Sequence, residues 1–329
     1  MHVRSKTRLI EAVPGSAQAA AECLSRGGLV AFPTETVYGL GADATNGQAV
    51  ARLYEAKGRP SFNPLIAHVP DLQSARKLAV FNADAERLAA AFWPGPLTLV
   101  LPRQPDCPVS DLATAGLDTI AIRVPDHAFA REILRAFGRP IVAPSANVSG
   151  HVSPTTAAHV LEDLDEKVDL IVDGGPAPVG IESTIVACLD QPMILRPGGL
   201  SRERIAAALG RDLAQPVATT DETPLAPGML ESHYAPRTRL RLDATRVEPG
   251  EALLAFGAPL PGAAATLNLS ESGDLSEAAA NLFGHLRSLD AMFAPTICVM
   301  RIPSAGLGEA INDRLRRAAA PKDIPPSSS

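Results

Sequence analysis

The sequence predicts a two-domain α/β protein. Its 329 residues suggest about two domains, each large enough to bury a core of its own. From about residue 15 to 210, short apolar runs alternate with helical patterns, which is typical of one α/β domain. An aperiodic stretch follows, and a second α/β pattern begins near residue 239. We therefore expect a first domain at 1–210, a linker at 211–236 and a second domain at 237–329.

The elements of the first domain follow from the spacing of apolar residues, which repeat every three to four positions in helices. The expected strands are 28–32, 65–69, 97–101, 119–124, 141–143, 170–172, 184–187 and 194–195. The expected helices are 16–26, 47–57, 84–91, 126–137, 155–164 and 202–209. Several strands are too short, and the loops too irregular, for a regular doubly wound sheet.

The linker and the second domain are distinguished by composition and periodicity. The linker is rich in Pro and Thr, but it ends in His233-Tyr234-Ala235-Pro236, which is unusually aromatic and polar for a spacer. The second domain should have strands near 239–242, 252–256 and 296–301, with helices at 276–289 and about 307–319. In the first of these helices a single stripe carries Ala279, Leu282, Phe283, Leu286 and Leu289.

Composition excludes several classes of protein. The net charge of −6 argues against non-specific nucleic-acid binding, which needs a basic face. The four cysteines lie far apart, so neither a zinc site nor a disulfide framework is indicated, as is usual in a reducing cytosol. No apolar run has the length of a signal peptide or of a membrane span, which needs about 20 residues. We expect a cytoplasmic protein with no membrane association.

The stretch Lys57–His68 is the most informative in the chain. Gly58 should end the preceding helix, and Pro60 and Pro64 should hold the following loop extended. Lys57 and Arg59 then resemble a clamp for phosphate or carboxylate groups. The alternative is a solvated helix C-terminus, where cations interact favourably with the helix dipole.

Two further segments carry small polar side chains after strands. Thr34 and Thr36 should face one side with Glu35 opposite, and their hydroxyls could bind a small polar ligand or simply end a Thr-rich strand. The run 144–154 contains serine and asparagine side chains before a helix, an arrangement suited to anion binding. N-capping by Ser153 or Thr155 would explain only part of that run.

Cations recur near the ends of elements. Besides Lys57 and Arg59, Arg123 ends an apolar strand and Arg196 precedes Pro197-Gly198. Singly, such arginines are usually surface ion-pair partners. Together, without a Ser-His-Asp or Cys-His arrangement, they indicate binding of a polyanion, with catalysis resting on stabilised phosphate charge.

These segments, in this order, resemble the Sua5/YrdC/YwlC family, the L-threonylcarbamoyladenylate synthases of tRNA N6-threonylcarbamoyladenosine (t6A37) biosynthesis. The matching segments of the first domain are Thr34–Gly41, Lys57–Leu65, Ser145–Thr156, Gly180–Val186 and Arg196–Gly199. The C-terminal half resembles the extra domain of the long Sua5 form, through Leu267–Ser270, Leu282-Phe283 and Gly306–Leu315. The resemblance implies a twisted YrdC-like α/β domain with a basic cavity and a small Rossmann-like second domain.

The resemblance also implies a reaction and its site. L-Threonine, bicarbonate or CO2, and ATP would give threonylcarbamoyl-AMP and pyrophosphate, with Mg²⁺ expected on the phosphates and no metal held by the protein. Lys57 and Arg59 would be catalytic. The threonine site would comprise Thr36, His68, Arg123, the Ala143 backbone and Ser183. The ATP site would comprise Arg59, Asn63, Thr119, Ser145, Ser153, Arg196 and Tyr234, the last on a linker that resembles a lid.

Three alternatives stay open from the sequence. His68 lies in an apolar strand and could be a core histidine whose hydrogen bonds are satisfied there. The whole chain could be an RNA-binding module with a basic concavity, although its charge and its few aromatic residues argue against this. A carbamoyl-phosphate-using transferase of the hydrogenase-maturation type would carry paired cysteines, which this chain lacks. The product would pass to the transferase complex that modifies tRNA, and direct tRNA binding is unsupported.

Overall fold

The computed structural model describes residues 6–214 and 234–320. The chain divides into two compact units, of which the first holds 1–149 and 153–229 and the second holds 150–152 and 230–329. Most of the expected linker, including His233, therefore lies outside the described residues. Within the described ranges, no helix has both the length and the apolar character that a bilayer crossing requires.

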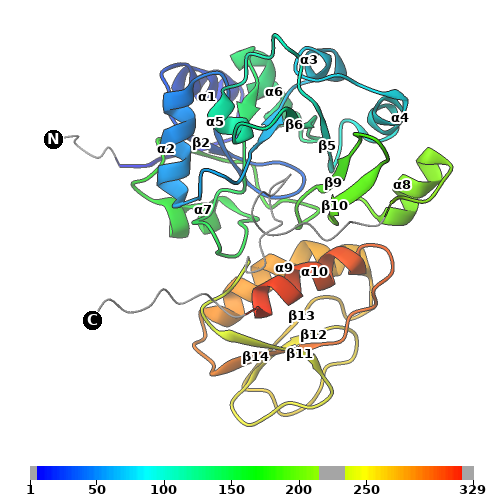
Figure 1. The fold of residues 1–329 in the computed structure, drawn as a ribbon. Coiled ribbons are helices and arrows are strands. Elements are labelled where there is room, and N and C mark those ends of the chain that lie inside the picture. The colour runs from blue at the N-terminus through cyan, green and yellow to red at the C-terminus, as the bar shows by residue number, and fades with distance from the viewer. Residues whose placement is uncertain (1–5, 215–233, 321–329) are drawn as a thin grey trace, which may run out of the picture. The chain divides into compact units, whose positions relative to one another are not determined.

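The first unit is a mixed α/β domain, which confirms the predicted fold class (Figure 1). Its strands are β1 (Arg8–Glu11), β2 (Val30–Phe32), β3 (Gly39–Asp43), β4 (Ile66–His68), β5 (Leu97–Pro102), β6 (Thr119–Arg123), β7 (Ile141–Val142), β8 (Leu170–Asp173), β9 (Thr184–Ala187) and β10 (Met193–Arg196). Its helices are α1 (Ser16–Ser25), α2 (Gly47–Lys57), α3 (Leu72–Arg76), α4 (Ala83–Phe92), α5 (Asp111–Thr114), α6 (Ala128–Phe137), α7 (Ala157–Leu164) and α8 (Arg202–Leu209).

The ten strands form one sheet in the order β1-β8-β2-β3-β7-β4-β6-β5-β9-β10. Parallel pairs such as β4 with β6 alternate irregularly with antiparallel pairs such as β5 with β6. The expected irregular sheet is therefore correct, but strands β1 and β3 were not predicted. β3 contains Gly41, where a Cβ atom would lie 2.8 Å from a ring carbon of Phe32, so the close approach of the two strands requires glycine.

The sheet carries different residues on its two faces around β4, β5, β6 and β9. Alternate residues such as Leu99, Ile122 and Val186 belong to the large buried core, together with helices α2 and α4. The intervening positions form a small apolar cluster that comprises Ile66, Val100, Ala121, Ile185 and Ala187. Because side chains alternate along a strand, residues two positions from this cluster share its face. That face carries the site described below.

The other end of the sheet is covered by a pair of helices. The α1 and α6 helices pack together and contribute Leu24, Ile133 and Leu134 to a second core over β2 and β8. The α6 helix begins at the N-cap His127 and ends at Gly138 in a left-handed conformation, a common C-terminal stop.

The second unit is a smaller α/β domain. Its strands are β11 (Arg239–Ala244), β12 (Ala252–Ala255), β13 (Ala265–Asn268) and β14 (Thr296–Met300), and its helices are α9 (Leu275–Asp290) and α10 (Gly308–Ala319). The strands pair in parallel in the order β11-β14-β12-β13. Both helices cover one face of this sheet (Figure 1). The predicted helices are confirmed, whereas β13, which has no fully buried residue, was missed.

Candidate active site

Three of the predicted site residues lie in one row across the first sheet. His68 of β4 pairs with Arg123 of β6, which pairs with Thr98 of β5. Thr98 pairs with Ile185 of β9, and Ile185 pairs with Arg196 of β10. Directly opposed residues of neighbouring strands project to the same face. The sheet register therefore brings the side chains of His68, Arg123 and Arg196 to one side, although they are far apart in the sequence.

Arg123 forms a buried ion pair that the sequence did not reveal. Its Nη2 atom lies 2.7 Å from Oε1 of Glu35, and both side chains are nearly inaccessible to solvent. Neither carboxylate oxygen of Glu35 makes a well-directed hydrogen bond to any described residue. A buried charge needs a close partner, and this pair leaves hydrogen-bonding capacity unused on both sides. The arrangement suits a site in which Arg123 can also engage an incoming carboxylate.

Glu35 belongs to a bend rather than to a strand. Residues 34–37 precede β3, and the hydroxyls of Thr34 and Thr36 lie 2.9 Å apart while Thr34 donates to the Val37 carbonyl oxygen. The expected strand end is therefore wrong, but the two threonines do face one another, with Glu35 directed to Arg123. The buried Thr36 stays a candidate for the threonine site.

The Lys57 side chain is buried and hydrogen-bonded to the backbone, rather than solvated at the end of the helix. Its Nζ atom donates to the carbonyl oxygens of Ser145 and Asn147, each at 2.5 Å, and its own carbonyl accepts from the Ser149 amide at 2.8 Å. Burial, together with the nearby Arg59 cation, holds the pKa of Lys57 well below its ordinary value. The alternative of a solvated C-terminus is thus wrong. Lys57 fixes the backbone of the loop that carries Ser145.

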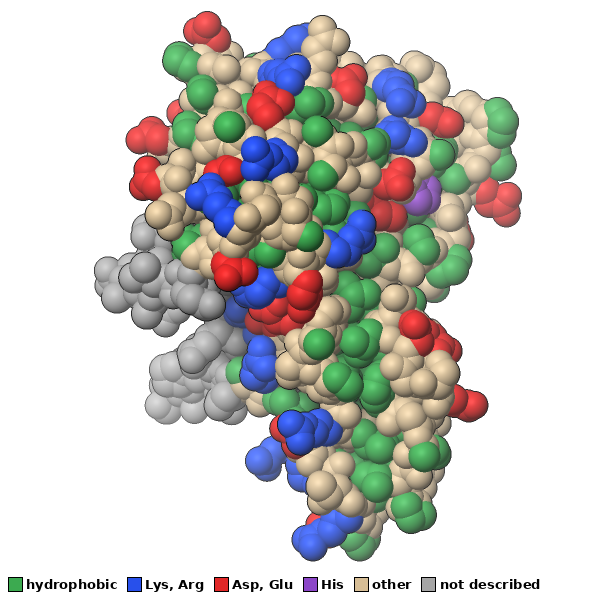
Figure 2. All heavy atoms as spheres, turned by 90° about the vertical axis from the view of Figure 1, so that its right-hand side faces the viewer, with side chains coloured by type: hydrophobic (Ala, Val, Ile, Leu, Met, Phe, Trp, Pro, Cys, Tyr) green, Lys and Arg blue, Asp and Glu red, His purple; other side chains and the backbone are tan. Residues whose placement is uncertain are grey.

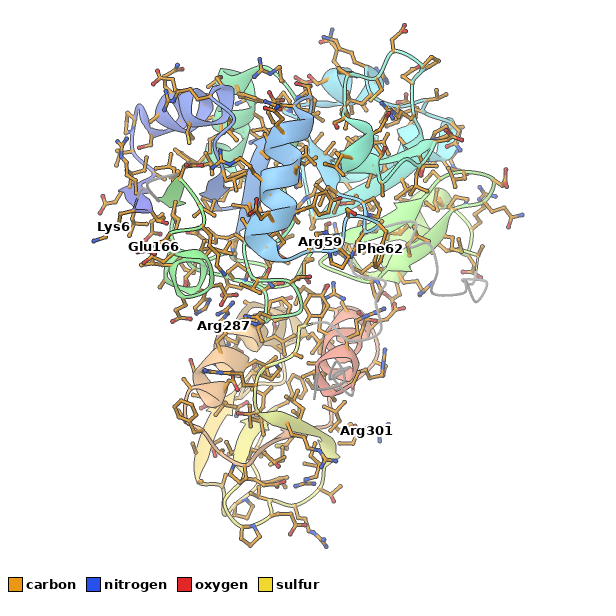
Figure 3. The ribbon with its side chains drawn as sticks, turned by 60° about the vertical axis from the view of Figure 1, so that its left-hand side comes forward. Lys6, Arg59, Phe62, Glu166, Arg287 and Arg301 are labelled. Atoms are coloured by element: carbon orange, nitrogen blue, oxygen red, sulfur yellow. The ribbon has the colours of Figure 1, made fainter. Side chains whose placement is uncertain are left out.

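The loop after Lys57 is held by hydrogen bonds from the Arg59 side chain to the loop's own carbonyl oxygens. Gly58 adopts a left-handed conformation and ends α2, as predicted. Arg59 donates through Nε to the carbonyl oxygen of Asn63 and through Nη2 to that of Pro64. Asn63 is buried, and its side-chain oxygen has no hydrogen-bond donor among the described residues. Figure 3 shows Arg59 and Phe62 on this loop, beside the lower end of α2.

The segments around Ser183 and Arg196 are packed backbone to backbone. Arg196 donates through Nη2 to the carbonyl oxygen of Ser183 at 2.9 Å, and the hydroxyls of Ser183 and Thr98 lie 2.8 Å apart. At Gly198 a Cβ atom would lie 2.3 Å from the carbonyl oxygen of Glu182, so only glycine permits this approach. Ser183 is thus placed beside the row that contains Arg123.

The predicted cap of α7 is corrected by the structure. Thr156 is the N-cap and accepts a hydrogen bond from the His159 amide, whereas neither Ser153 nor Thr155 occupies that position. Ser153 instead donates to Oε1 of Glu182 at 2.5 Å and is fully buried. Ser153 therefore contacts the same segment as Arg196, which supports its candidacy as a site residue.

Thr119 and Ala143 are two further candidates on the first sheet. Thr119 and Arg123 are the first and last residues of β6, so they share a face but are separated by about 13 Å at the usual rise per residue. Ala143 follows β7, and its amide donates to the Ile66 carbonyl oxygen at 3.1 Å. The backbone of Ala143 is therefore placed directly beside β4, the strand that carries His68.

Tyr234 lies in the second unit. Its ring stacks on Phe283 of α9 with centroids 5.6 Å apart, and the guanidinium carbon of Arg314 lies 4.9 Å from the centre of the Tyr234 ring. Tyr234 has a left-handed backbone conformation, which is uncommon for a residue with a side chain. The end of the linker is thus anchored on α9 and α10 by aromatic and cation–π contacts.

His68 is neutral in the folded protein. Its Nδ1 atom lies 3.1 Å from the carbonyl oxygen of Ile66, and burial, followed by repulsion from Arg123, lowers the pKa of His68 to about 3. A neutral imidazole next to Arg123 can donate or accept a hydrogen bond without adding charge. His68 is thus a buried side chain with a hydrogen-bond partner, and it also lies beside the Arg123 cation. Both interpretations from the sequence apply to it.

This neutral state predicts a specific pH dependence of stability. Below the unfolded pKa of about 6.5, the unfolded chain binds a proton that the folded chain cannot bind until about pH 3. As the pH falls from 7 to 5, His68 should therefore lower the free energy of unfolding by about 2 kcal/mol. Above pH 7 it should have no such effect. Urea unfolding at the two pH values should show a smaller loss for His68→Gln than for the wild type. His151→Gln is the control, because His151 is exposed. If His68→Gln and His151→Gln lose the same unfolding free energy between pH 7 and pH 5, the assignment is contradicted.

The fold and these side chains define a mixed α/β domain with buried cations, joined to a smaller α/β domain. Residues 22–198 match the Sua5/YciO/YrdC family, described as telomere recombination, and residues 200–320 match the C-terminal domain of threonylcarbamoyl-AMP synthase. The chain belongs to the Sua5/YrdC family, in its two-domain form.

Similar proteins support this assignment. The threonylcarbamoyl-AMP synthase of Bacillus subtilis is 43% identical over 94% of each chain, and that of Pyrococcus abyssi is 42% identical over 91% of this chain and 93% of the relative. The crystal structure of P. abyssi Sua5 complexed with L-threonine superimposes with a TM-score of 0.88 at 38% identity, covering 95% of this chain and 98% of that one. Escherichia coli YciO shares the fold of the first unit at a TM-score of 0.54.

Proposed function

We propose that this chain is a threonylcarbamoyl-AMP synthase, an enzyme that converts L-threonine, bicarbonate or CO2 and ATP into threonylcarbamoyl-AMP and pyrophosphate. The observation that carries the proposal is the position of Arg123. It is a buried cation with unused hydrogen-bonding capacity, placed beside His68 and Ser183 on one face of the sheet. That is the chemistry needed to hold an amino-acid carboxylate away from water. Relatives that match nearly the whole chain carry the same activity in their names.

The reaction proceeds in two bond-forming steps. The neutral amine of threonine attacks CO2 and loses a proton, which gives a carbamate. A carbamate oxygen then attacks the α-phosphorus of ATP, and the bond to the β-phosphate oxygen breaks as pyrophosphate leaves. This transfer of an adenylyl group makes the enzyme a nucleotidyltransferase. The threonine carboxylate, the carbamate and the triphosphate are all anionic, so catalysis depends on holding them together against their repulsion.

The threonine end of the site lies on the row across the sheet. Arg123 binds the carboxylate, and Thr36, His68, Ser183 and the Ala143 backbone surround the rest of the amino acid. Because His68 is neutral, it accepts or donates a hydrogen bond without competing for the carboxylate. Ser183 is held by Thr98 and by Arg196, which keeps its hydroxyl in a defined place.

The nucleotide end of the site is assigned to the cationic loops. Arg59, Arg196 and Lys57 supply positive charge, and Asn63, Thr119, Ser145 and Ser153 supply polar contacts. Lys57 acts by holding the 145–149 backbone in place, because its ammonium group is already bonded to two carbonyl oxygens. Tyr234 is assigned to the ATP site by the family resemblance alone.

Magnesium is expected to enter with the nucleotide. The described residues contain no group of three or more His, Cys, Asp or Glu side chains arranged to hold a metal ion. Mg²⁺ commonly keeps several waters and binds through substrate phosphates. We therefore treat it as part of the MgATP substrate, neutralising phosphate charge, and assign it no ligand from the protein.

The product is proposed to pass to the complex that transfers the threonylcarbamoyl group to tRNA. No contact between this chain and tRNA is needed, since threonine is activated before RNA is modified. The face shown in Figure 2 carries interspersed acidic and basic side chains rather than one basic surface. Together with the net charge of −6, this gives no support to a general RNA-binding role.

The activity is tested by measuring pyrophosphate release from MgATP while threonine or bicarbonate is omitted in turn. We expect release only when both are present, and little release when serine replaces threonine at the same concentration. Release that continues without threonine would contradict the proposed substrate. Folded protein that releases no pyrophosphate under any condition would contradict the proposed function.

A further inference from the structure

The second unit contains a cavity that the proposed reaction does not use. It has a volume of about 520 Å³ and lies where β11 and β14 end, against the middle of α10. Because the two strands are parallel neighbours, their carboxyl ends lie at the same edge of the sheet. In open α/β sheets this edge is where ligands usually bind, and the volume is in the range of small-molecule sites.

The cavity combines cationic, acidic and apolar side chains. Arg301 and Arg316 line it, and neither makes an ion pair or hydrogen bond with the described residues. Asp243, at a distortion of β11 with a left-handed backbone conformation, lines it as well and likewise has no partner there. The partly exposed side chains of Leu242 and Met300 supply apolar surface. Figure 3 shows Arg301 at this edge of the second unit, next to α10.

The loop between β14 and α10 is built to hold a fixed shape. The side-chain amide of Asn312 donates to the carbonyl oxygen of Ile302 at 3.1 Å. Gly306 adopts a left-handed conformation, and at Gly308 a Cβ atom would lie 1.8 Å from the Pro303 carbonyl oxygen. These constraints account for the motif Gly306–Leu315, which the catalytic site leaves unexplained. A rigid loop keeps the cavity open and its arginines in place.

We propose that this cavity binds a small phosphate-bearing molecule of nucleotide size. Arg301 and Arg316 would bind the phosphate, since paired guanidinium groups match phosphate oxygens in geometry and charge. Asp243 would accept hydrogen bonds from the hydroxyls of a sugar, and Leu242 and Met300 would contact the base. A cavity of about 520 Å³ with apolar walls suits one small molecule better than an extended RNA backbone. The assignment is independent of the proposed catalytic reaction.

The test is hydrogen–deuterium exchange of the full chain with AMP or inorganic phosphate, because exchange locates binding within the chain. AMP should protect segments 299–305 and 312–316 in addition to any protection in the first unit. AMP should bind there more tightly than phosphate alone, because the sugar and base add contacts. The nucleotide assignment would be overturned if saturating AMP left exchange in these segments unchanged. It would also be overturned if phosphate bound as tightly as AMP.

Variants separate the cavity from the rest of the protein. Arg301→Ala and Arg316→Ala should each weaken this binding roughly tenfold, and the double variant roughly a hundredfold, at the usual value of a charged hydrogen bond. Arg239→Ala is the matched control, because Arg239 is exposed at the opposite end of β11. All four variants should keep the wild-type melting temperature and pyrophosphate release. Protection of 299–305 that persists in the double variant would contradict the role of the two arginines.

Discussion

Replacing Arg123 by methionine should both destabilise the protein and abolish its use of threonine. The substitution leaves Glu35 as a buried carboxylate without its partner, a change that costs about 3–5 kcal/mol. It also removes the proposed partner of the threonine carboxylate, and the loss of a charged, paired contact should lower threonine-dependent pyrophosphate release at least about 100-fold. Urea unfolding and the pyrophosphate assay measure the two effects separately.

A double variant distinguishes loss of function from loss of fold. Glu35→Gln combined with Arg123→Met removes both charges, so much of the stability should return while threonine use stays lost. Arg76→Met is the matched control, since Arg76 and Glu86 form an ion pair of the same 2.7 Å length on the surface. That change should cost less than about 1 kcal/mol and leave activity intact. Wild-type activity in the double variant would remove Arg123 from the threonine site.

Lys57→Met should weaken ATP use by loosening the loop at 145–149. The methionine fills the space but leaves the carbonyl oxygens of Ser145 and Asn147 without a donor, at a cost of about 2–5 kcal/mol. We expect a lower melting temperature, faster hydrogen exchange in residues 145–149 and an ATP requirement raised more than about tenfold. Threonine binding, which rests on the row across the sheet, should change less.

The exposed Lys77 provides the comparison for this effect. Lys77→Met removes an ammonium group at the end of α3 that is open to solvent, so stability and ATP use should stay at wild-type values. A Lys57→Met variant with wild-type exchange at 145–149 would contradict the tethering role. If exchange there increases but the ATP requirement is unchanged, the loop does not contribute to nucleotide binding.

Local rules predicted those parts of the fold whose causes are local. The end of α2 followed from Gly58 and the two prolines that come after it, and helices such as α9 followed from their apolar stripes. Strand β3 escaped prediction because Gly39 and Gly41 have low strand propensity and are required by close packing against other chain segments. β1 escaped because it is an exposed edge strand without an apolar alternation.

The same distinction holds for the candidate site. The sequence indicated Lys57, Arg59, Arg123 and Arg196 as cations near the ends of elements, and the family resemblance attached roles to them. It could not reveal that Glu35 pairs with Arg123, because a contact across that separation depends on the register of the sheet. It likewise could not show that Lys57 is buried against two carbonyl groups, since a cation at a helix end is more often solvated.

The most direct test of the proposed activity is to identify the product. The protein would be incubated with MgATP, L-threonine and ¹³C-bicarbonate, and the nucleotides analysed by mass spectrometry alongside pyrophosphate. We predict an adduct of threonine and AMP that carries the heavy carbon and forms in step with pyrophosphate release. Pyrophosphate released together with AMP alone, with no labelled adduct even at the earliest times, would contradict the proposed synthesis of threonylcarbamoyl-AMP.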